Sequence, residues 1–140
     1  MDDIDEKIIA ILEENGRTSY TEVGKQIGLS EGAVRRRVKT LMNSGAIRKF
    51  TIQIGFEKGA KAILLLTTTP SIPTSNISET LIKIEGIKSV HEVTGEYDIA
   101  VFLSTSNIKE INHSIEEIRR IEGVKSTNTV IILRDWGSEY

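Results

Sequence analysis

The chain has 140 residues, 39% of them hydrophobic and 27% charged, which is the composition of a globular protein with one or two small domains. It contains no cysteine, so disulfide bonds and thiolate metal sites are excluded. Residues 1–16 are acidic and amphipathic, unlike a signal peptide, and no apolar run approaches the length of a membrane span. We therefore expect a cytoplasmic protein that makes no membrane contact.

The net charge of −2 conceals an uneven distribution of charge along the chain. Residues 16–50 contain eight Lys or Arg against two Glu, a local charge of +6. Residues 62–140 contain seven Lys or Arg against eleven Asp or Glu, a local charge of −4. Because the local field governs an encounter with DNA more than the total charge does, this pattern predicts a basic nucleic-acid-binding module joined to an acidic one.

The first predicted element is a helix over residues 2–15. Asp2 and Asp3 lie in its first turn, where negative charge stabilises the positive end of the helix dipole, and Gly16 ends it. The apolar side chains that share one face of this helix are Ile4, Ile8, Ile11 and Leu12. This stripe allows the helix to pack against the two helices predicted next, so that the three together enclose a core.

Two further helices joined by a tight turn are predicted next. The first covers residues 19–28, the turn contains the Gly-Leu pair at 28–29, and the second helix covers residues 30–45. Ser30 is a favourable N-cap and Gly45 a favourable stop for the second helix. The first of these helices buries Val23 and Ile27. Two short helices with a glycine-bearing turn are typical of a helix-turn-helix.

The second of these helices has one apolar face and one cationic face. Its apolar stripe consists of Val34, Val38, Leu41 and Met42. Its opposite face consists of Gly32, Arg36, Lys39 and Asn43, with Arg35 at the border. Arg37 lies nearer the apolar stripe, so we expect it in packing or in an internal ion pair. The cationic face predicts DNA contact, although a short basic run on a helix is often only a solvated surface.

After Gly45 the hydrophobic period changes from that of a helix to two. Phe50, Ile52 and Ile54 alternate with polar residues, which predicts a strand. No second strand follows within hairpin reach, so we expect a reduced wing whose strand pairs with another subunit. Residues 55–61 are the predicted hinge between a domain at 1–54 and a domain at 62–140.

The C-terminal part contains an internal repeat. KIEGIKSV at residues 83–90 recurs 37 residues later as RIEGVKST at 120–127. Each copy ends a unit of strand, helix and strand, and the two units meet at Gly95 and Glu96. The predicted elements are strands at 62–69, 87–94, 97–104 and 124–133, and helices at 75–85 and 107–122. The fold class is therefore α+β: a winged-helix-like helix-turn-helix with a reduced wing, then a ferredoxin-like βαββαβ domain.

The predicted strands are apolar on both faces, as shown by Ile63 and Leu65 opposite Leu64 and Leu66. Two helices cover only one face of a four-stranded sheet, and an exposed apolar face of this size is rare on a monomer. A second copy of the sheet is the simplest cover. Helix-turn-helix proteins commonly bind as two-fold dimers with recognition helices about 34 Å apart, so we expect a homodimer.

Three stretches together resemble the Lrp/AsnC family, the feast/famine regulators. They are the acidic amphipathic first helix, LSEGAVRRRVKTLMNSGAI at residues 29–47 and TGEYDIAVFL at 94–103. The resemblance covers almost the whole chain in the same order. It implies an N-terminal domain that binds double-stranded DNA and a C-terminal effector domain. It also implies dimers, in many members octamers of four dimers, and a small molecule, usually an amino acid, bound between effector domains.

The resemblance also assigns residues to two sites. It implies DNA contact by Ser30, Glu31, Gly32, Arg35, Arg36 and Lys39, with Ser19 and Tyr20 near the phosphates. It implies an effector site at Gly95, Glu96, Tyr97 and Asp98, with Thr127 and Thr129 nearby. A glycine turn can expose backbone N–H groups to a ligand carboxylate, and Asp98 can accept from its ammonium group. Met42 and Asn43 stand where the family often has an acidic residue, which leaves operator preference open.

Other interpretations of these residues remain open. The turn at residues 95–98 is also what a simple hairpin needs, and threonine favours strands without any ligand role. His91 and His113 lie in different units, and no P-loop, GxGxxG, GxSxG or HExxH motif is present, so we expect no enzyme, no metal and no cofactor. Two alternatives to a specific regulator are a low-specificity architectural DNA-binding protein and a metabolite-binding module without a DNA role.

Overall fold

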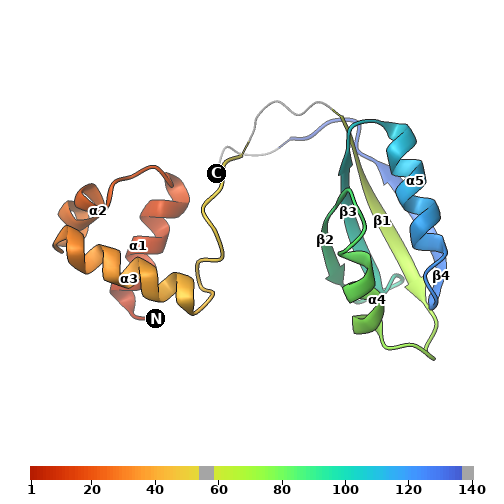
Figure 1. Cartoon of the computed structure of the whole chain (residues 1–140), viewed down its shortest axis with the longest axis horizontal. Helices are drawn as coiled ribbons and strands as arrows, with labels where there is room; N and C mark the ends of the chain where they lie inside the picture. The colour runs from red at the N-terminus through yellow and green to blue at the C-terminus, as the bar shows by residue number, and fades with distance from the viewer. Residues whose placement is uncertain (54–58, 137–140) are drawn as a thin grey trace. The chain divides into compact units, whose positions relative to one another are not determined.

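The computed structural model describes residues 1–53 and 59–136, which form two compact units (Figure 1). The first unit is helical, and the second is built on a sheet. Residues 54–58 lie outside the described residues. They include Ile54 of the predicted strand and residues 55–58 of the predicted hinge at 55–61. No helix in the described part of the chain is long and apolar enough to cross a membrane.

The N-terminal unit contains the three predicted helices, α1 (Asp3–Glu14), α2 (Tyr20–Ile27) and α3 (Glu31–Asn43). Each contributes to a single core, whose buried side chains are Ile8, Leu12, Val23, Val34, Val38 and Leu41. Met42, predicted in the α3 stripe, is instead 43% exposed. At about 100° per residue it lies about 80° around the helix from Val34, so it falls outside a core contact centred on Val34, Val38 and Leu41.

Local side-chain and backbone bonds set the ends of these helices. Asp2 and Asp5 form a reciprocal capping box at the start of α1. The hydroxyls of Ser19 and Ser30 accept from backbone N–H groups at the starts of α2 and α3, over 3.1 and 3.2 Å. The backbone of Gly45 after α3 is left-handed, with φ of 78°. The predicted N-cap at Ser30 and stop at Gly45 are therefore confirmed.

The turn between α2 and α3 is fixed by a close backbone approach. The N–H of Leu29 donates to the carbonyl of Gly24 over 2.9 Å. A Cβ atom at Gly24 would lie only 2.2 Å from the carbonyl oxygen of Leu29, so no other residue fits here without moving the backbone. Gly28 supplies the left-handed turn with φ of 78°. These glycines set the angle between the two helices.

The predicted strand at residues 50–54 is not present in residues 50–53 of the structure. A strand needs hydrogen bonds from a neighbouring strand, and none in the described parts of the chain lies beside this segment. Phe50 is 46% and Ile52 77% exposed. The alternating pattern was therefore insufficient to form a strand in a single chain, and no wing forms in residues 46–53.

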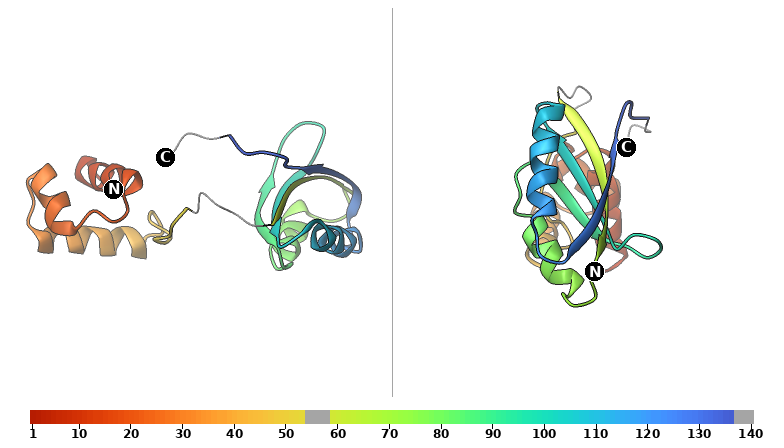
Figure 2. Two further views of the ribbon diagram at one scale, coloured as in Figure 1. Left: turned by 90° about the horizontal axis from the view of Figure 1, so that it is seen from above. Right: turned by 90° about the vertical axis from the view of Figure 1, so that its right-hand side faces the viewer.

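The C-terminal unit has the predicted βαββαβ order. Its elements are β1 (Ala60–Thr68), α4 (Thr74–Leu81), β2 (Ile87–Glu92), β3 (Ile99–Thr105), α5 (Ile108–Arg119) and β4 (Val124–Ile131). The antiparallel sheet has the strand order β2-β3-β1-β4. Both helices lie on the same side of it (Figure 2). The ferredoxin-like prediction is confirmed, with α4 ending earlier than the predicted residue 85.

The core of this unit lies between the sheet and the two helices. Alternate β1 side chains point into it, and the fully buried ones there are Ala62, Leu64 and Leu66. Their partners from other elements include Ile77, Leu81, Ile99, Val101, Ile111 and Ile118. The helices thus cover one face of the sheet, as the repeat predicts.

The opposite face of the sheet is open and partly apolar. Ile63 of β1 pairs with Phe102 of β3 and with Val130 of β4, so these three side chains stand side by side on this face. Phe102 is 39% and Val130 46% exposed. The ring of His91 lies edge-on to Phe102, with centroids 5.7 Å apart. The predicted apolar character of both faces is confirmed for the central strands.

Candidate DNA-binding surface and effector site

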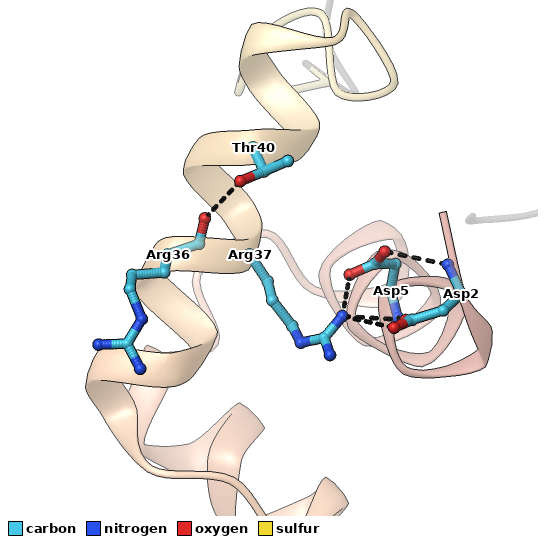
Figure 3. Close-up of polar contacts among 5 residues, drawn as sticks. All are labelled: Asp2, Asp5, Arg36, Arg37 and Thr40. Atoms are coloured by element: carbon cyan, nitrogen blue, oxygen red, sulfur yellow. Dashed lines mark hydrogen bonds and ion pairs between the residues drawn. The ribbon is translucent and has the colours of Figure 1, made fainter.

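The outer surface of α3 carries cationic side chains that have no anionic partner in the described residues. Arg36 and Lys39 are exposed, and neither forms an ion pair there. Figure 3 shows Arg36 pointing away from α1, on the side of α3 opposite Arg37. The hydroxyl of Thr40 donates to the backbone carbonyl of Arg36 over 3.1 Å, a contact that does not involve the Arg36 guanidinium. This surface can donate hydrogen bonds to phosphates or to base edges.

Arg35 lies beside this surface in a different environment. Its Nε and Nη2 atoms both donate to one carboxylate oxygen of Glu31, with Nε 3.0 Å away. Its guanidinium carbon lies 5.6 Å from the centre of the Tyr20 ring. The hydrogen bond to Glu31, and then the charge of Glu31, raise the pKa of Arg35 above its usual value. Arg35 is therefore charged, partly neutralised and held in place.

Arg37 forms an internal ion pair, which is one of the two roles that the sequence predicts for it. Its Nη1 atom donates to Asp2 over 2.8 and 3.0 Å and to Asp5 over 2.8 Å (Figure 3). The backbone N–H of Asp5, and then Arg37, hold the pKa of Asp2 below its ordinary value of 3.8. The contact ties the start of α1 to the middle of α3. Arg37 is therefore part of the support beneath the recognition surface.

The remaining predicted DNA contacts lie at the beginnings of α2 and α3. Ser19 and Ser30 use their oxygens as N-caps, which leaves each hydroxyl proton available to a phosphate. Tyr20 is half-buried, and its contact with Arg35 joins the α2 residues to those on α3. Gly32 is half-buried in the first turn of α3. The structure thus places all eight predicted residues on these two helices or their caps.

The predicted effector turn connects β2 to β3. Gly95 is left-handed there, with φ of 109°. Asp98 is anchored to the end of β1, because its backbone N–H donates to Leu66 and its Oδ2 accepts from the backbone N–H and hydroxyl of Thr68, over 2.7 and 3.2 Å. This tie to Thr68 has no signal in the sequence. Oδ1 of Asp98 has no partner in the described residues and is the oxygen left for a ligand.

Thr127 and Thr129 lie at the same end of the sheet but on the helix-covered face. They pair with the buried Leu66 and Leu64 of β1, and the hydroxyl of Thr127 accepts from Arg119 over 3.1 Å. Tyr97 instead accepts from the side chain of Asn128, a residue that points to the open face. Within one chain, the sheet therefore separates Tyr97 from the two threonines. The sequence analysis named neither Asn128 nor Arg119: the contact of Asn128 joins residues 31 positions apart, and that of Arg119 joins the end of α5 to β4 across a turn.

Two surface hollows on the C-terminal unit do not coincide with the predicted effector residues. One, of about 470 Å³, lies between α4 and α5 and is lined by residues such as Asn76 and Arg120. The other, of about 750 Å³, lies at the start of α5 near Lys88 and His113. Neither is lined by residues 95–98, Thr127 or Thr129. In the described residues no group of three or more His, Asp or Glu is arranged to hold a metal ion.

Comparison with known proteins gives matches over both units. Residues 1–42 match the AsnC-type helix-turn-helix domain, and residues 61–139 match the Lrp/AsnC ligand-binding domain. The chain is 46% identical to the HTH-type transcriptional regulator LysM of Saccharolobus solfataricus, covering 97% of this chain and 96% of that protein. It is 38% identical to the regulator FL11 of Pyrococcus furiosus, covering 96% and 90%.

A solved structure gives the same result for the fold. The feast or famine regulatory protein of M. tuberculosis, complexed with L-methionine, is similar with a TM-score of 0.83 and 27% identity. The match covers 99% of this chain and 95% of that one. The similarity extends through both units.

The backbone N–H of Asp5, and then the ion pair with Arg37, lower the pKa of Asp2 and so predict a pH-dependent stability of the N-terminal unit. Because the pKa of Asp2 is lowered on folding, its contribution to stability is present above pH 3.8 and is lost as pH falls through the lower folded value. In Arg37→Gln the Asp2 pKa, measured by NMR titration of its carboxyl group, should rise. It should stay below 3.8, because the Asp5 N–H remains.

The matched control is Arg17→Gln, which removes from the same unit an exposed cation that forms no ion pair with the described part of the chain. It should leave the Asp2 titration unchanged. An Asp2 pKa equal in wild type and Arg37→Gln would contradict the assigned contact.

Proposed function

The chain belongs to the Lrp/AsnC family, and we propose that it is a sequence-specific transcription regulator that binds double-stranded DNA through α3 and responds to an amino acid or a related metabolite. The observation that carries the proposal is the charge of Arg36 and Lys39, which have no anionic partner among residues 1–53 and 59–136, on the second helix of a helix-turn-helix. We assign DNA binding to residues 1–54 and effector binding and assembly to 62–140; of the predicted hinge at 55–61, residues 60 and 61 belong to β1.

The DNA contacts divide by chemistry. Arg36 and Lys39 carry free charge suited to phosphates, and the hydroxyls at the starts of α2 and α3 can donate to phosphates as well. Arg35 has an ordered guanidinium suited to a base edge. The tie between Arg37 and α1 holds these side chains on a fixed helix. This division supports specific recognition over general coating of DNA, because charge alone carries no sequence information.

We further propose a homodimer in which two copies bury their open sheet faces against each other. The support is the row of Ile63, Phe102 and Val130, which an aqueous monomer leaves exposed. A two-fold dimer also supplies the second recognition helix that a palindromic operator needs. Octamers, which the family resemblance implies, would be built from such dimers.

For the effector, we propose an amino acid bound near the turn that contains Gly95 and Asp98. Asp98 Oδ1 is the proposed acceptor for the ligand ammonium, because Oδ2 is used by Thr68. Neither hollow described above reaches this turn, so we propose that a second copy completes the site. Thr127, on the helix-covered face, would then act through Arg119, and Gly95, Glu96 and Tyr97 would join Asp98 at the ligand.

Other parts of the proposal follow from the relatives. Proteins similar to this chain are named as transcription regulators, so we propose a regulator without catalytic activity that acts on DNA in the cytoplasm. L-methionine, the ligand in the M. tuberculosis structure, is the first amino acid to test.

DNA binding is tested by the dependence of affinity on salt. Each phosphate contact contributes about 0.9 to the slope of log affinity against log salt concentration. Arg36→Ala and Lys39→Ala should each weaken binding to the protein's own upstream DNA and reduce the slope by about 0.9, as measured by fluorescence anisotropy. Lys109→Ala removes an exposed cation from α5 and should leave the slope unchanged. Equal binding by all four proteins would contradict the assigned surface.

Assembly is tested by placing a charge on the open sheet face. Val130→Asp would bury an unpaired carboxylate in the proposed interface, so it should shift the protein toward monomer in sedimentation at micromolar concentration. Ile108→Asp is the matched control, because Ile108 is 57% exposed on α5 and Val130 46% exposed on β4. A monomeric wild-type protein, or equal dissociation by both variants, would contradict the proposed interface.

The effector is tested by thermal shift with single amino acids, beginning with L-methionine. A ligand at 100 times its Kd stabilises the folded state by about 2.7 kcal/mol, which raises Tm measurably. Asp98→Asn retains an acceptor for Thr68 but loses the negative charge, so it should keep the Tm of the free protein and lose the shift. Glu92→Gln, an exposed neighbour on β2, should respond as wild type. If no common amino acid changes Tm or oligomer size, the effector proposal fails.

A further inference from the structure

Two side chains of the first two turns of α3 and one of α2 form an arrangement that the family assignment does not explain. Glu31 and Arg35 form an i,i+4 ion pair, and the Tyr20 ring of α2 lies beside the guanidinium. The side chains of Arg35 and Glu31 are 66% and 39% exposed, so the pair faces the solvent from which DNA approaches. The resemblance lists Glu31 as a DNA contact, yet in the free protein its carboxylate is already bonded to Arg35.

The bonding pattern leaves one edge of the guanidinium available. Nε and one N–H of Nη2 are directed to Glu31, which occupies the side edge of the planar group. Nη1 has no partner in the described residues, so the end edge formed by Nη1 and the second N–H of Nη2 remains open. Two parallel N–H donors on that edge match the O6 and N7 acceptors of guanine.

The charge of Glu31 also changes what Arg35 gains from DNA. A phosphate attracts an arginine mainly through charge, and the neighbouring carboxylate opposes that attraction. A guanine edge offers two directional acceptors, and its recognition depends on the orientation of the donors. Arg36 and Lys39 form no ion pair with any residue that the structure describes, so they keep their full attraction to phosphates. The pair with Glu31 therefore favours base recognition over phosphate binding at Arg35 alone.

We propose that Glu31 is a positioning residue that orients Arg35 toward a guanine and suppresses its use as a phosphate contact, with the Tyr20 ring supporting the guanidinium plane. This inference rests on the proposed DNA-binding function and names a specificity device within it. The other role open to Glu31 is direct acceptance from a cytosine amino group. That role requires Glu31 to leave Arg35, and it predicts a different result in the experiment below.

The experiment selects preferred sequences from a random duplex pool with four full-length proteins: wild type, Glu31→Gln, Arg35→Ala and the double variant. Wild type should select a guanine that Arg35→Ala loses. Glu31→Gln should reduce the preference at that same position by about tenfold, the order of one bidentate contact. In the double variant, the loss of Glu31 should add nothing to the loss of Arg35.

The second measurement is the affinity for random duplex as a function of salt. Glu31→Gln should bind random DNA more tightly than wild type, with a salt slope steeper by about 0.9, because Arg35 is released to a phosphate. Glu13→Gln is the charge-matched control. Glu13 is an exposed residue of α1 that forms no ion pair within the described ranges, and this variant should keep the wild-type preference. Circular dichroism of each variant checks that α3 is intact.

The outcomes distinguish a failure of the positioning role of Glu31 from a failure of the proposed DNA binding. A lost preference at a position other than the one lost by Arg35→Ala would assign Glu31 to a direct base contact and overturn the positioning role. An unchanged preference in Glu31→Gln would also overturn it. A wild-type protein that binds duplex DNA and selects no sequence would overturn the positioning role while leaving DNA binding in place. No binding to any duplex would overturn the proposed function itself.

Discussion

A four-stranded sheet has two faces, and this chain provides helices for only one of them. The alternation that buries Leu64 and Leu66 under α4 and α5 necessarily turns Ile63 and its neighbours Phe102 and Val130 to the other side. No rearrangement of side chains removes that exposure, because a one-residue shift of register would only exchange the two faces. The need to cover this face is the constraint on which the proposed dimer depends.

In the N-terminal unit, a single helix, α3, both packs against the core and carries cationic side chains. Val34, Val38 and Leu41 use one face, and the arginines occupy three distinct environments around it. Arg37 is neutralised toward α1, Arg35 is paired along its own helix, and Arg36 is free. Three consecutive arginines therefore lie in three different environments, because each step of about 100° around the helix turns the next side chain to another side.

Much of this arrangement can be predicted from the sequence, because it depends on local chemistry. Ser30 and Gly45 bound α3 through interactions within a few residues, and the position of Arg37 near the apolar stripe indicates an internal ion pair. The partners of Arg37 and the tie from Asp98 to Thr68 could not be predicted, since they join residues about thirty positions apart. The same limit applies to the strand predicted near Phe50, whose pattern gives no partner.

The face occupied by each residue of β4 illustrates a second limit. Alternation shows that Thr127 and Thr129 share a side of the sheet, but it does not show which side the helices cover. The structure places them toward Arg119 and places Asn128 beside Tyr97. The predicted effector residues are therefore divided between the two faces of the sheet, because successive residues of β4 point to opposite sides.

The contact between Gly24 and the carbonyl of Leu29 has a consequence for protein engineering. It fixes the crossing of α2 and α3 through backbone atoms alone, whereas Gly32 on α3 has open space where a side chain would extend. The crossing angle of α2 and α3 and the side chains on the outer face of α3 are thus determined by separate residues. Libraries that vary the outer face of α3 and conserve this one turn can yield new operator preferences on an unchanged scaffold.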